Sequence, residues 1–254
     1  MQIALTAKQM RAVDEYMMNK RHIPGIILME NAARGVCDIV MEQIEPCVAH
    51  VFCGTGNNGG DGLAVGRILM AHGYDVYVVV LGEPGSMTVD TATNFAMFAD
   101  MGECAKCITG FDQFDAWDIP EAELVVDAVF GTGLTREVEG IYADCIDHIN
   151  ASLGATVVSI DIPSGINADT GAAMGIAVVA DITVTFQYPK LGHFLFPGRE
   201  HAGYTEVVMI GVDDGCDVAD EGVVVYYSDD EEMELEPRRM NSNKGDYGRL
   251  LFVA

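Results

Sequence analysis

The stretch VAHVFCGTGNNGGDGLAVGRILMAHGYDVYVVVLG, residues 48–82, decides the fold of this chain. Its apolar runs at 48–53 and 76–81 predict two buried strands. A helical pattern lies between them, at about 62–72. A strand, a helix and a second strand in this order are typical of a βαβ unit, in which the two strands lie parallel.

The segment between the first strand and the helix, GTGNNGGDG at residues 54–62, is rich in glycine. Glycine permits positive φ and close approach of backbone amides, and such loops at helix N-termini bind phosphate or another anion. Asn57, Asn58 and Asp61 add the oxygen ligands that hard cations prefer. The segment departs from the GxGxxG dinucleotide motif. It predicts a site for phosphate, a cation or both, and a glycine-rich turn without a ligand is the alternative.

Strands and helices alternate through the rest of the chain. A capping box at 6–9 opens a first helix, and further helices are expected at 26–43, 86–101 and 140–151. Further strands are expected at 124–128, 156–160, 180–186 and 205–210, while the acidic segment up to Glu123 looks variable. The pattern predicts an α/β, Rossmann-like three-layer sandwich, in which helices cover both faces of a mostly parallel sheet.

Composition narrows the range of partners. The 254 residues carry 39 acidic and 14 basic side chains, a formal net charge of −25 that disfavours nucleic acid and anionic membrane surfaces. No apolar run is long enough to span a membrane and no signal peptide is recognisable, so we expect a cytoplasmic protein. The cysteines, seven in number, are expected to be reduced thiols, and the single CxxC at 104–107 has no second pair.

Three polar loops follow predicted parallel strands, and the carboxyl ends of such strands meet at one edge of the sheet. These loops carry residues 57–61, Asp127 with residues 131–137, and Asp161 with Ser164. Either of the two strand-end aspartates could instead cap the loop after it through an Asx turn. The sequence offers few lysines and arginines near these carboxylates, and Arg136 is the nearest, so a bound cation would supply the missing positive charge.

Neither hydrolase nor transition-metal chemistry is indicated. Ser164 follows a proline and lacks the GxSxG motif, and the histidines show no metal-ligand spacing. His193 alone lies near the expected crevice.

Taken together, the blocks GTGNNGGDG, DAVFGTGL and SIDIPSGINADTG resemble the YjeF N-terminal domain, the NAD(P)H-hydrate epimerase family. LMENAARG and TVTFQYPKLGHFLFPG, which contains Lys190, agree with it, and the resemblance covers about residues 5–212. It implies epimerisation of the R and S forms of NAD(P)H-hydrate, the damaged forms of NADH and NADPH. The sequence leaves open the roles of Lys190 and His193, and which of the two hydrates is preferred.

The resemblance also implies site residues, a potassium ion and a homodimer. The potassium ligands would be Asn58, Asp127 and Ser164. The residues implied to bind the substrate are Asn57, Asn58, Gly59, Gly60, Asp61, Gly131, Thr132, Gly133, Leu134, Thr135, Arg136, Glu137 and Asp161.

Asp161 is our candidate for the catalytic acid and base. Moving the hydroxyl group between the two faces of the ring needs a proton given to the departing hydroxyl and one removed from the returning water. A carboxylate in a closed pocket can have its pKa raised, which would let Asp161 serve both steps. Replacing Asp161 by asparagine is then expected to abolish the reaction and to leave the fold intact.

The end of the chain differs from the rest. Residues 1–227 are interpreted as the epimerase domain, and 228–254 as a linker followed by the truncated start of a second domain. RRMNSNKGDYGRLLFVA resembles the opening of a ribokinase-like NAD(P)H-hydrate dehydratase domain, so we expect no dehydratase activity from this fragment. The alternative function is a non-catalytic, dimeric scaffold or binding domain of the same fold. A nucleotide-binding kinase is disfavoured because no Walker lysine follows the glycine loop.

Overall fold

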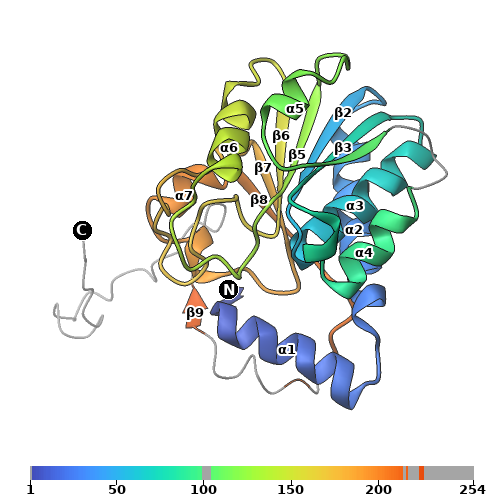
Figure 1. The fold of residues 1–254 in the computed structure, drawn as a ribbon. Coiled ribbons are helices and arrows are strands. Elements are labelled where there is room, and N and C mark those ends of the chain that lie inside the picture. The colour runs from blue at the N-terminus through green and yellow to red at the C-terminus, as the bar shows by residue number, and fades with distance from the viewer. Residues whose placement is uncertain (1, 99–103, 214–215, 217–222, 226–254) are drawn as a thin grey trace, which may run out of the picture.

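A computed structural model describes residues 2–98, 104–213, 216 and 223–225. Within these residues, seven parallel strands form one sheet in the order β4-β3-β2-β5-β6-β7-β8 (Figure 1). The strands are β2 (Val48–Cys53), β3 (Asp75–Leu81), β4 (Ala105–Ile108), β5 (Leu124–Ala128), β6 (Thr156–Ile160), β7 (Ile182–Phe186) and β8 (Tyr204–Val208). The predicted parallel α/β sheet is therefore confirmed.

Helices cover both faces of the sheet (Figure 1). One face carries α2 (Gly25–Gln43), α3 (Asn57–Ala71) and α4 (Val89–Ala96), and the other carries α5 (Asp112–Asp115) and α6 (Ile141–Ala151). Shorter elements are the 3₁₀ turns η1 (Pro84–Ser86) and η2 (Leu191–His193), and α7 (Gly198–His201).

Two hydrophobic cores form because the central strands are buried on both faces. In β2, Val51 and its same-face neighbours pack in the core that contains Leu63 of α3, while Phe52 packs in the core that contains Ile146 of α6. Side chains of a strand alternate between the two faces, so a strand covered on both sides needs apolar residues at nearly every position. This explains why the strands appear in the sequence as uninterrupted apolar runs.

The order of the strands reverses between β2 and β5. From β2 the chain proceeds to β3 and β4 in one direction, and from β5 to β6, β7 and β8 in the other. Loops that leave the carboxyl ends of two such strands turn away from each other and open a crevice, where ligands of open α/β sheets bind. The glycine-rich segment after β2 and the loop after β5 border this crevice.

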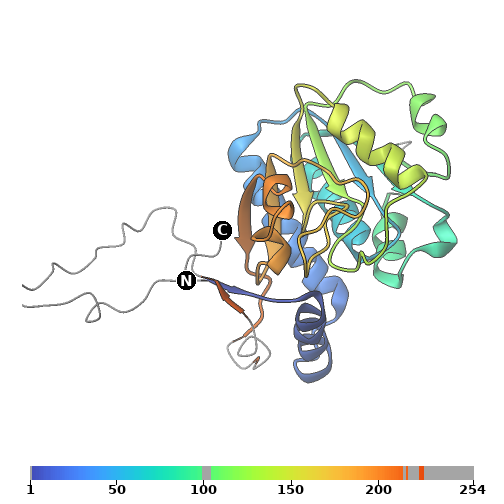
Figure 2. The same cartoon turned by 90° about the vertical axis from the view of Figure 1, so that its left-hand side faces the viewer.

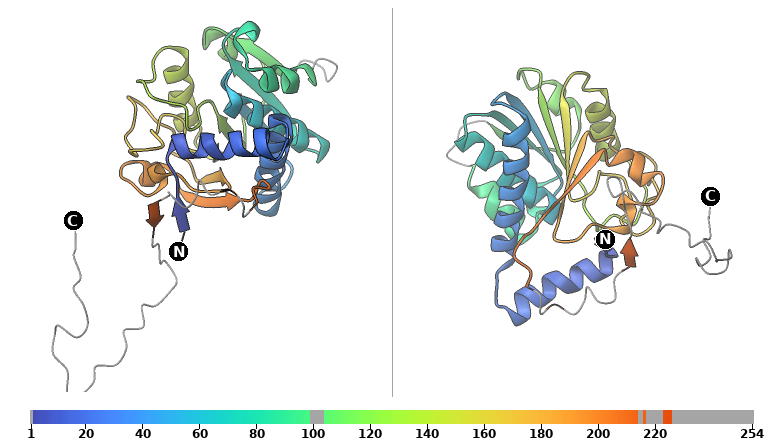
Figure 3. Two further views of the ribbon diagram at one scale, coloured as in Figure 1. Left: turned by 90° about the horizontal axis from the view of Figure 1, so that it is seen from below. Right: turned by 180° about the vertical axis from the view of Figure 1, so that it is seen from behind.

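One helix, α1 (Ala7–Lys20), lies apart from the two helical layers. It begins at the predicted capping box, in which the Thr6 hydroxyl accepts from Gln9 N and the Gln9 side chain accepts from Thr6 N. The views from the side and from below show α1 running across the carboxyl-end edge of the sheet (Figures 2 and 3). Strand β1 (Gln2–Ala4), just before it, pairs antiparallel with β9 (Val223–Val225).

Three of the sequence predictions need correction. Helix α3 begins at Asn57, five residues before the predicted start, because tight packing against the sheet outweighs the low helix propensity of glycine. Strand β4 and helix α5 occupy the segment expected to be variable, where β4 is a partly buried edge strand with little apolar signal. The helix predicted at 86–101 is the shorter α4, which starts at Val89, directly after its N-cap Thr88.

The predicted linker and second-domain start, residues 228–254, lie outside the described residues. None of the helices that the structure describes combines the length and the apolar character needed to cross a lipid bilayer.

Candidate functional site

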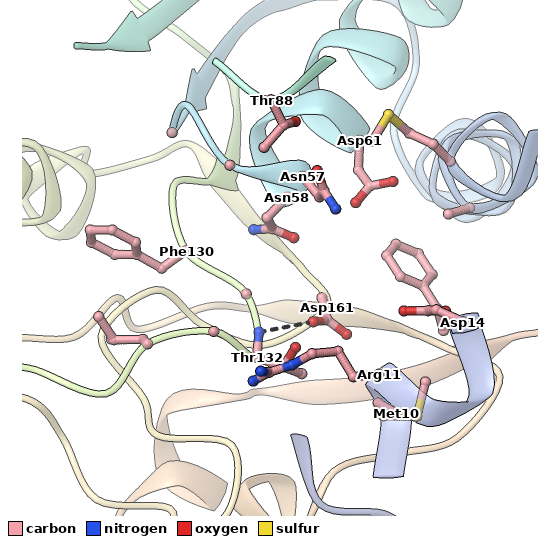
Figure 4. A pocket seen from close by; sticks show the side chains of 18 of the residues that line it. Met10, Arg11, Asp14, Asn57, Asn58, Asp61, Thr88, Phe130, Thr132 and Asp161 are labelled. Carbon is pink, nitrogen blue, oxygen red and sulfur yellow. Dashed lines mark hydrogen bonds between the residues drawn. The ribbon is translucent and has the colours of Figure 1, made fainter. Parts of the chain in front are cut away.

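A cavity of about 740 Å³ opens at the carboxyl ends of β2, β5 and β6, between the sheet and α1 (Figure 4). Its volume falls within the range of about 300–1,000 Å³ that is usual for small-molecule sites. The cavity coincides with the reversal of strand order, so the position that the three strand-end loops predicted is where the structure has its crevice.

Most of the predicted substrate-binding residues line this cavity. They are Asn57, Asn58, Asp61, Gly131, Thr132, Gly133, Leu134, Thr135, Arg136 and Asp161. Gly59 and Gly60 are instead buried in α3, and Glu137 is exposed outside the cavity lining. The predicted potassium ligands Asp127 and Ser164 are fully buried behind the cavity wall.

Packing explains much of the glycine content near α3. A Cβ atom added to Gly59 would lie 1.8 Å from the carbonyl oxygen of Gly54, and one added to Gly62 would lie 2.4 Å from the Cβ of Ala128. The glycines therefore let α3 approach the sheet closely, a role that requires no ligand. A Cβ at Gly56 or Gly133 would meet nothing within 4 Å, so only these positions leave open space at the cavity.

The N-terminus of α3 remains suited to an anion. The helix begins at Asn57 with Gly56 as its N-cap, and no side chain caps it. Its first N–H groups and the positive end of its dipole therefore face the cavity without a side-chain acceptor. Exposed Arg136 reaches the cavity from the loop after β5, and α1 adds a second arginine, Arg11, which the sequence did not place there.

Asp161 is the most constrained residue of the site. It follows β6 in a left-handed conformation, with φ of 70°, and it is only 8% exposed. Its Oδ1 lies 2.5 Å from Nζ of Lys190, a lysine that is 1% exposed, and its Oδ2 accepts from Thr132 N at 3.3 Å. The carboxylate is thus held between a buried ammonium group and the loop that follows β5. Figure 4 shows the hydrogen bond from Thr132.

The charge state of Asp161 differs from the one that the sequence analysis expected. Burial alone would raise its pKa, but the charge and hydrogen bond of Lys190 outweigh burial, and the pKa of Asp161 is lowered. The expectation of a raised pKa is wrong because it ignored this partner. At neutral pH Asp161 is ionised, so it can accept a proton but has none to donate.

His193 fixes the backbone at Asp161. Its Nδ1 accepts a hydrogen bond of 3.0 Å from the backbone N of Lys190, so its proton resides on Nε2, which donates to the carbonyl oxygen of Asp161 at 3.0 Å. Burial, assisted by Lys190, lowers the pKa of His193 to about 4, and the ring stays neutral at physiological pH. Lys190 and His193, whose roles the sequence left open, both position Asp161.

Asp127 joins neighbouring strands beneath the cavity. Its Oδ2 accepts from Ser159 Oγ at 2.7 Å and from Ser164 N at 2.8 Å, and its Oδ1 accepts from Ser164 Oγ at 2.5 Å. A weaker bond of 3.3 Å from Val129 N matches the Asx-turn alternative. Ser164 Oγ in turn accepts from Phe130 N at 2.8 Å. Burial raises the pKa of Asp127 even though these serine bonds oppose the shift.

The residues implied to hold potassium fit a hard monovalent cation in their chemistry. No ion pair reaches the buried carboxylate of Asp127 within the described part of the chain. Asn58 lies against Gly131, next to Phe130, and its buried Nδ2 has no hydrogen-bond partner among the described residues. A half-turn of the Asn58 amide would exchange Nδ2 for Oδ1, which could then bind the cation. The residues described include no cluster of three or more His, Cys, Asp or Glu suited to a metal ion.

Sequence reasoning missed the contribution of α1. Met10, Arg11, Asp14 and Met18 all line the cavity. Residues 10, 14 and 18 share one stripe of the helix because they are spaced by four. That spacing is visible in the sequence, but the apolar pattern of Met10, Val13 and Met17 defined an adjacent face that shares only Met10 with the stripe.

Comparisons with known proteins agree with this architecture. The family described as YjeF-related protein N-terminus matches residues 25–192. This chain belongs to that family. The crystal structure of yeast ynu0 has the same fold, with a TM-score of 0.65 and 20% sequence identity, over 81% of this chain and 87% of the yeast chain.

Two relatives of this chain in sequence illustrate two kinds of protein, one short and one bifunctional. A Levilactobacillus brevis protein named NAD(P)H-hydrate epimerase is 40% identical over 218 residues, which are 82% of this chain and 94% of that protein. A Thermofilum pendens protein named bifunctional NAD(P)H-hydrate repair enzyme Nnr is 39% identical over 97% of this chain. The chain spans about half, 47%, of the length of that bifunctional relative.

The pair of Asp161 and Lys190 yields a prediction about stability. Asp161→Asn leaves a buried ammonium group without its counter-charge, so it should lower the free energy of unfolding by about 3–5 kcal/mol. We therefore expect Asp161→Asn to destabilise the fold, whereas the sequence analysis expected it to leave the fold intact. Denaturant unfolding of Asp161→Asn, Lys190→Met and the double variant measures this.

The double variant is the control. It removes both charges, so it should be more stable than Asp161→Asn alone. If the double variant lost as much free energy of unfolding as the two single variants together, a direct coupling between these side chains would be contradicted.

Proposed function

We propose that this chain is an NAD(P)H-hydrate epimerase, an isomerase that interconverts the R and S hydrates of NADH and NADPH. The observation that carries the proposal is a single cavity in which an uncapped helix N-terminus and an ionised, buried aspartate both face the ligand space. The first suits a diphosphate and the second suits proton transfer at a ring. The name of the Levilactobacillus brevis relative, which the match covers almost completely, supports the same activity.

The substrate class sets the chemistry. A hydrated nicotinamide ring carries a hydroxyl on C6, beside the ring nitrogen. When this hydroxyl is protonated it can leave as water, because the nitrogen lone pair forms a C=N bond to the same carbon. Water that returns from the other face and loses a proton gives the opposite epimer. The reaction needs one proton donor and one proton acceptor, but no net oxidation.

The cavity accommodates the two ends of such a molecule in different places. The N–H groups at the start of α3, near Asn57, would bind the diphosphate, and Arg136 would offset part of its charge. Asp161, held by Lys190 and Thr132 N, would face the ring. Since it is ionised, its role is that of the base that takes the proton from returning water.

Potassium is part of the proposal. Asn58, Asp127 and Ser164 would hold it, supported by the unpartnered amide of Asn58 and by the buried charge of Asp127, which no described ion pair neutralises. Bound there, the ion would supply positive charge behind the loop after β5, the loop that borders the diphosphate site. The residues of this chain carry out every proton transfer.

Further assignments are proposals of the same standing. The bifunctional name of the Thermofilum pendens relative supports a second repair function as a covalent partner in a longer chain. The sequence resemblance implies that this partner is a C-terminal dehydratase domain and that the chain forms a homodimer, and a cytoplasmic location is the expectation from the sequence. A non-catalytic scaffold is the rival. It is disfavoured because the buried pair of Asp161 and Lys190 places charge beside an open cavity, at a cost in stability that a scaffold does not require.

The activity is tested by mixing the purified chain with the R-hydrate and a separate S-specific dehydratase. The chain should accelerate clearance of the R-hydrate far beyond spontaneous epimerisation. Asp161→Asn, assayed at a temperature at which it remains folded, should be slower by about 10²–10⁴-fold because the base is lost. If the wild-type chain leaves the clearance rate unchanged, it is not an epimerase of this substrate.

Potassium binding predicts a stabilisation that requires no substrate. At a hundred times its dissociation constant the ion should stabilise the fold by about 2.7 kcal/mol, visible as a rise in Tm. Tetramethylammonium at equal ionic strength is the control. Asn58→Leu, which removes a ligand and the unpartnered amide together, should abolish the rise. Equal Tm values in the two salts would rule out this site.

A further inference from the structure

The proposed epimerisation lacks a proton donor. Asp161 is ionised beside Lys190, and its neighbour His193 is a neutral ring whose one proton is used on the backbone of Asp161. In addition, the hydroxyl departs from one face of the ring and returns on the other. A single carboxylate on one wall of the cavity reaches only one of these faces, so a second group on the facing wall is required.

Helix α1 forms that facing wall. It crosses the carboxyl-end edge of the sheet (Figure 3). Asp161, in contrast, directly follows the last residue of β6, on the sheet itself. The stripe of α1 that faces the cavity consists of Met10, Asp14 and Met18, with Arg11 beside it. In the close view, the carboxyl group of Asp14 points into the space that Asp161 also faces (Figure 4). Asp14 is the one acidic side chain of α1 that lines the cavity.

We propose that Asp14 is a catalytic residue, the proton donor to the departing hydroxyl on the face of the ring opposite Asp161. This inference rests on the proposed epimerase function and adds a residue to it. A ring held between α1 and the end of β6 would present one face to each carboxyl group.

The surroundings of Asp14 favour its protonated form. Half-buried between two methionines, it has its pKa raised to about 6, chiefly by burial, which exceeds the opposing effect of Lys190. Asp161 and Glu15 raise the pKa further by repulsion. The charged groups that line the cavity around it, apart from Glu15 on its own helix, are Arg11, Asp61, Asp90, Arg136, Asp161 and Lys190. Three close carboxyl groups, Asp14, Asp61 and Asp161, share one buried ammonium group, which pairs with Asp161.

Asp61 is the competing donor, since burial raises its pKa well above the usual value. It belongs to the first turns of α3, however, the helix whose N-terminus we assign to the diphosphate. There, a protonated Asp61 avoids repulsion with the phosphates and can donate a hydrogen bond to them. In the proposal, Asp61 therefore binds the diphosphate and Asp14 serves the ring.

The proton balance closes over one turnover. The Asp14 carboxyl group gives its proton to the hydroxyl, and the C–O bond breaks to release water. Water then adds to the other face of the C=N bond, and Asp161 takes one of its protons. Asp161 passes that proton to solvent, which Lys190 favours, and Asp14 regains one from solvent. The reverse direction runs through the same steps backwards, so Asp161 must first take a proton from solvent, which Lys190 disfavours.

The test combines a pH profile with matched variants of the full chain. For the wild type, kcat/KM should fall as the pH rises through about 6, because deprotonated Asp14 cannot donate. Asp14→Asn should lower kcat by about 10²–10⁴-fold, change KM little and remove that fall. Glu15→Gln, an exposed neighbour on the same helix, should keep the wild-type kcat and move the fall only slightly to lower pH, because it removes the weak repulsion that Glu15 exerts on Asp14.

The outcomes are distinguishable. A wild-type chain without epimerase activity overturns the proposed function, whatever Asp14 does. An active wild type whose rate does not fall between pH 5 and 8 overturns the role of Asp14, and this result needs no variant to fold. An Asp14→Asn variant that is as active as wild type also overturns the role of Asp14. The same conclusion follows if the fall in rate with rising pH disappears in Asp61→Asn and persists in Asp14→Asn.

Discussion

The ion pair between Asp161 and Lys190 is the interaction on which the site depends. A lysine that is 1% exposed is costly to bury, and here its charge is compensated by one carboxylate and by hydrogen bonds to Thr185 Oγ1 and Phe186 O. In return, the pair fixes both the position and the charge of Asp161. The left-handed backbone of Asp161 and the neutral His193 belong to the same arrangement, since the histidine holds the carbonyl group of the strained residue.

A second constraint is the tight contact between α3 and the sheet. Gly59 and Gly62 bring the helix so close to β2 and β5 that its N-terminus reaches the crevice where the strand order reverses. The same closeness places Asn58 against Gly131. Beneath them, Asp127 and Ser164 anchor the loop after β5 through Phe130 N. Packing and hydrogen bonds therefore hold both the anion-binding N-terminus of α3 and the ionised carboxylate of Asp161 on rigid elements.

Much of this could be predicted from sequence, for identifiable reasons. Strands buried on both faces leave apolar runs, and polar residues just after them mark the crevice. The strands β2, β5 and β6 were therefore found, and most of the predicted substrate-binding residues line the cavity. Pairings between distant segments leave no such pattern. Nothing local shows that Lys190 neutralises Asp161, and so the pKa of Asp161 was predicted in the wrong direction. The cavity-facing stripe of α1 was missed because the apolar pattern marks an adjacent face of the helix, which overlaps the stripe only at Met10.

The central claim is that Lys190 keeps Asp161 ionised, which separates the base of the site from its acid. A pH titration of the Asp161 carboxyl carbon by ¹³C NMR, assigned with the Asp161→Asn variant, tests it most directly. The account predicts that the carboxyl group titrates below its usual value of about 3.9 and shows no change between pH 5 and 8. A titration of Asp161 centred within that neutral range would contradict the account.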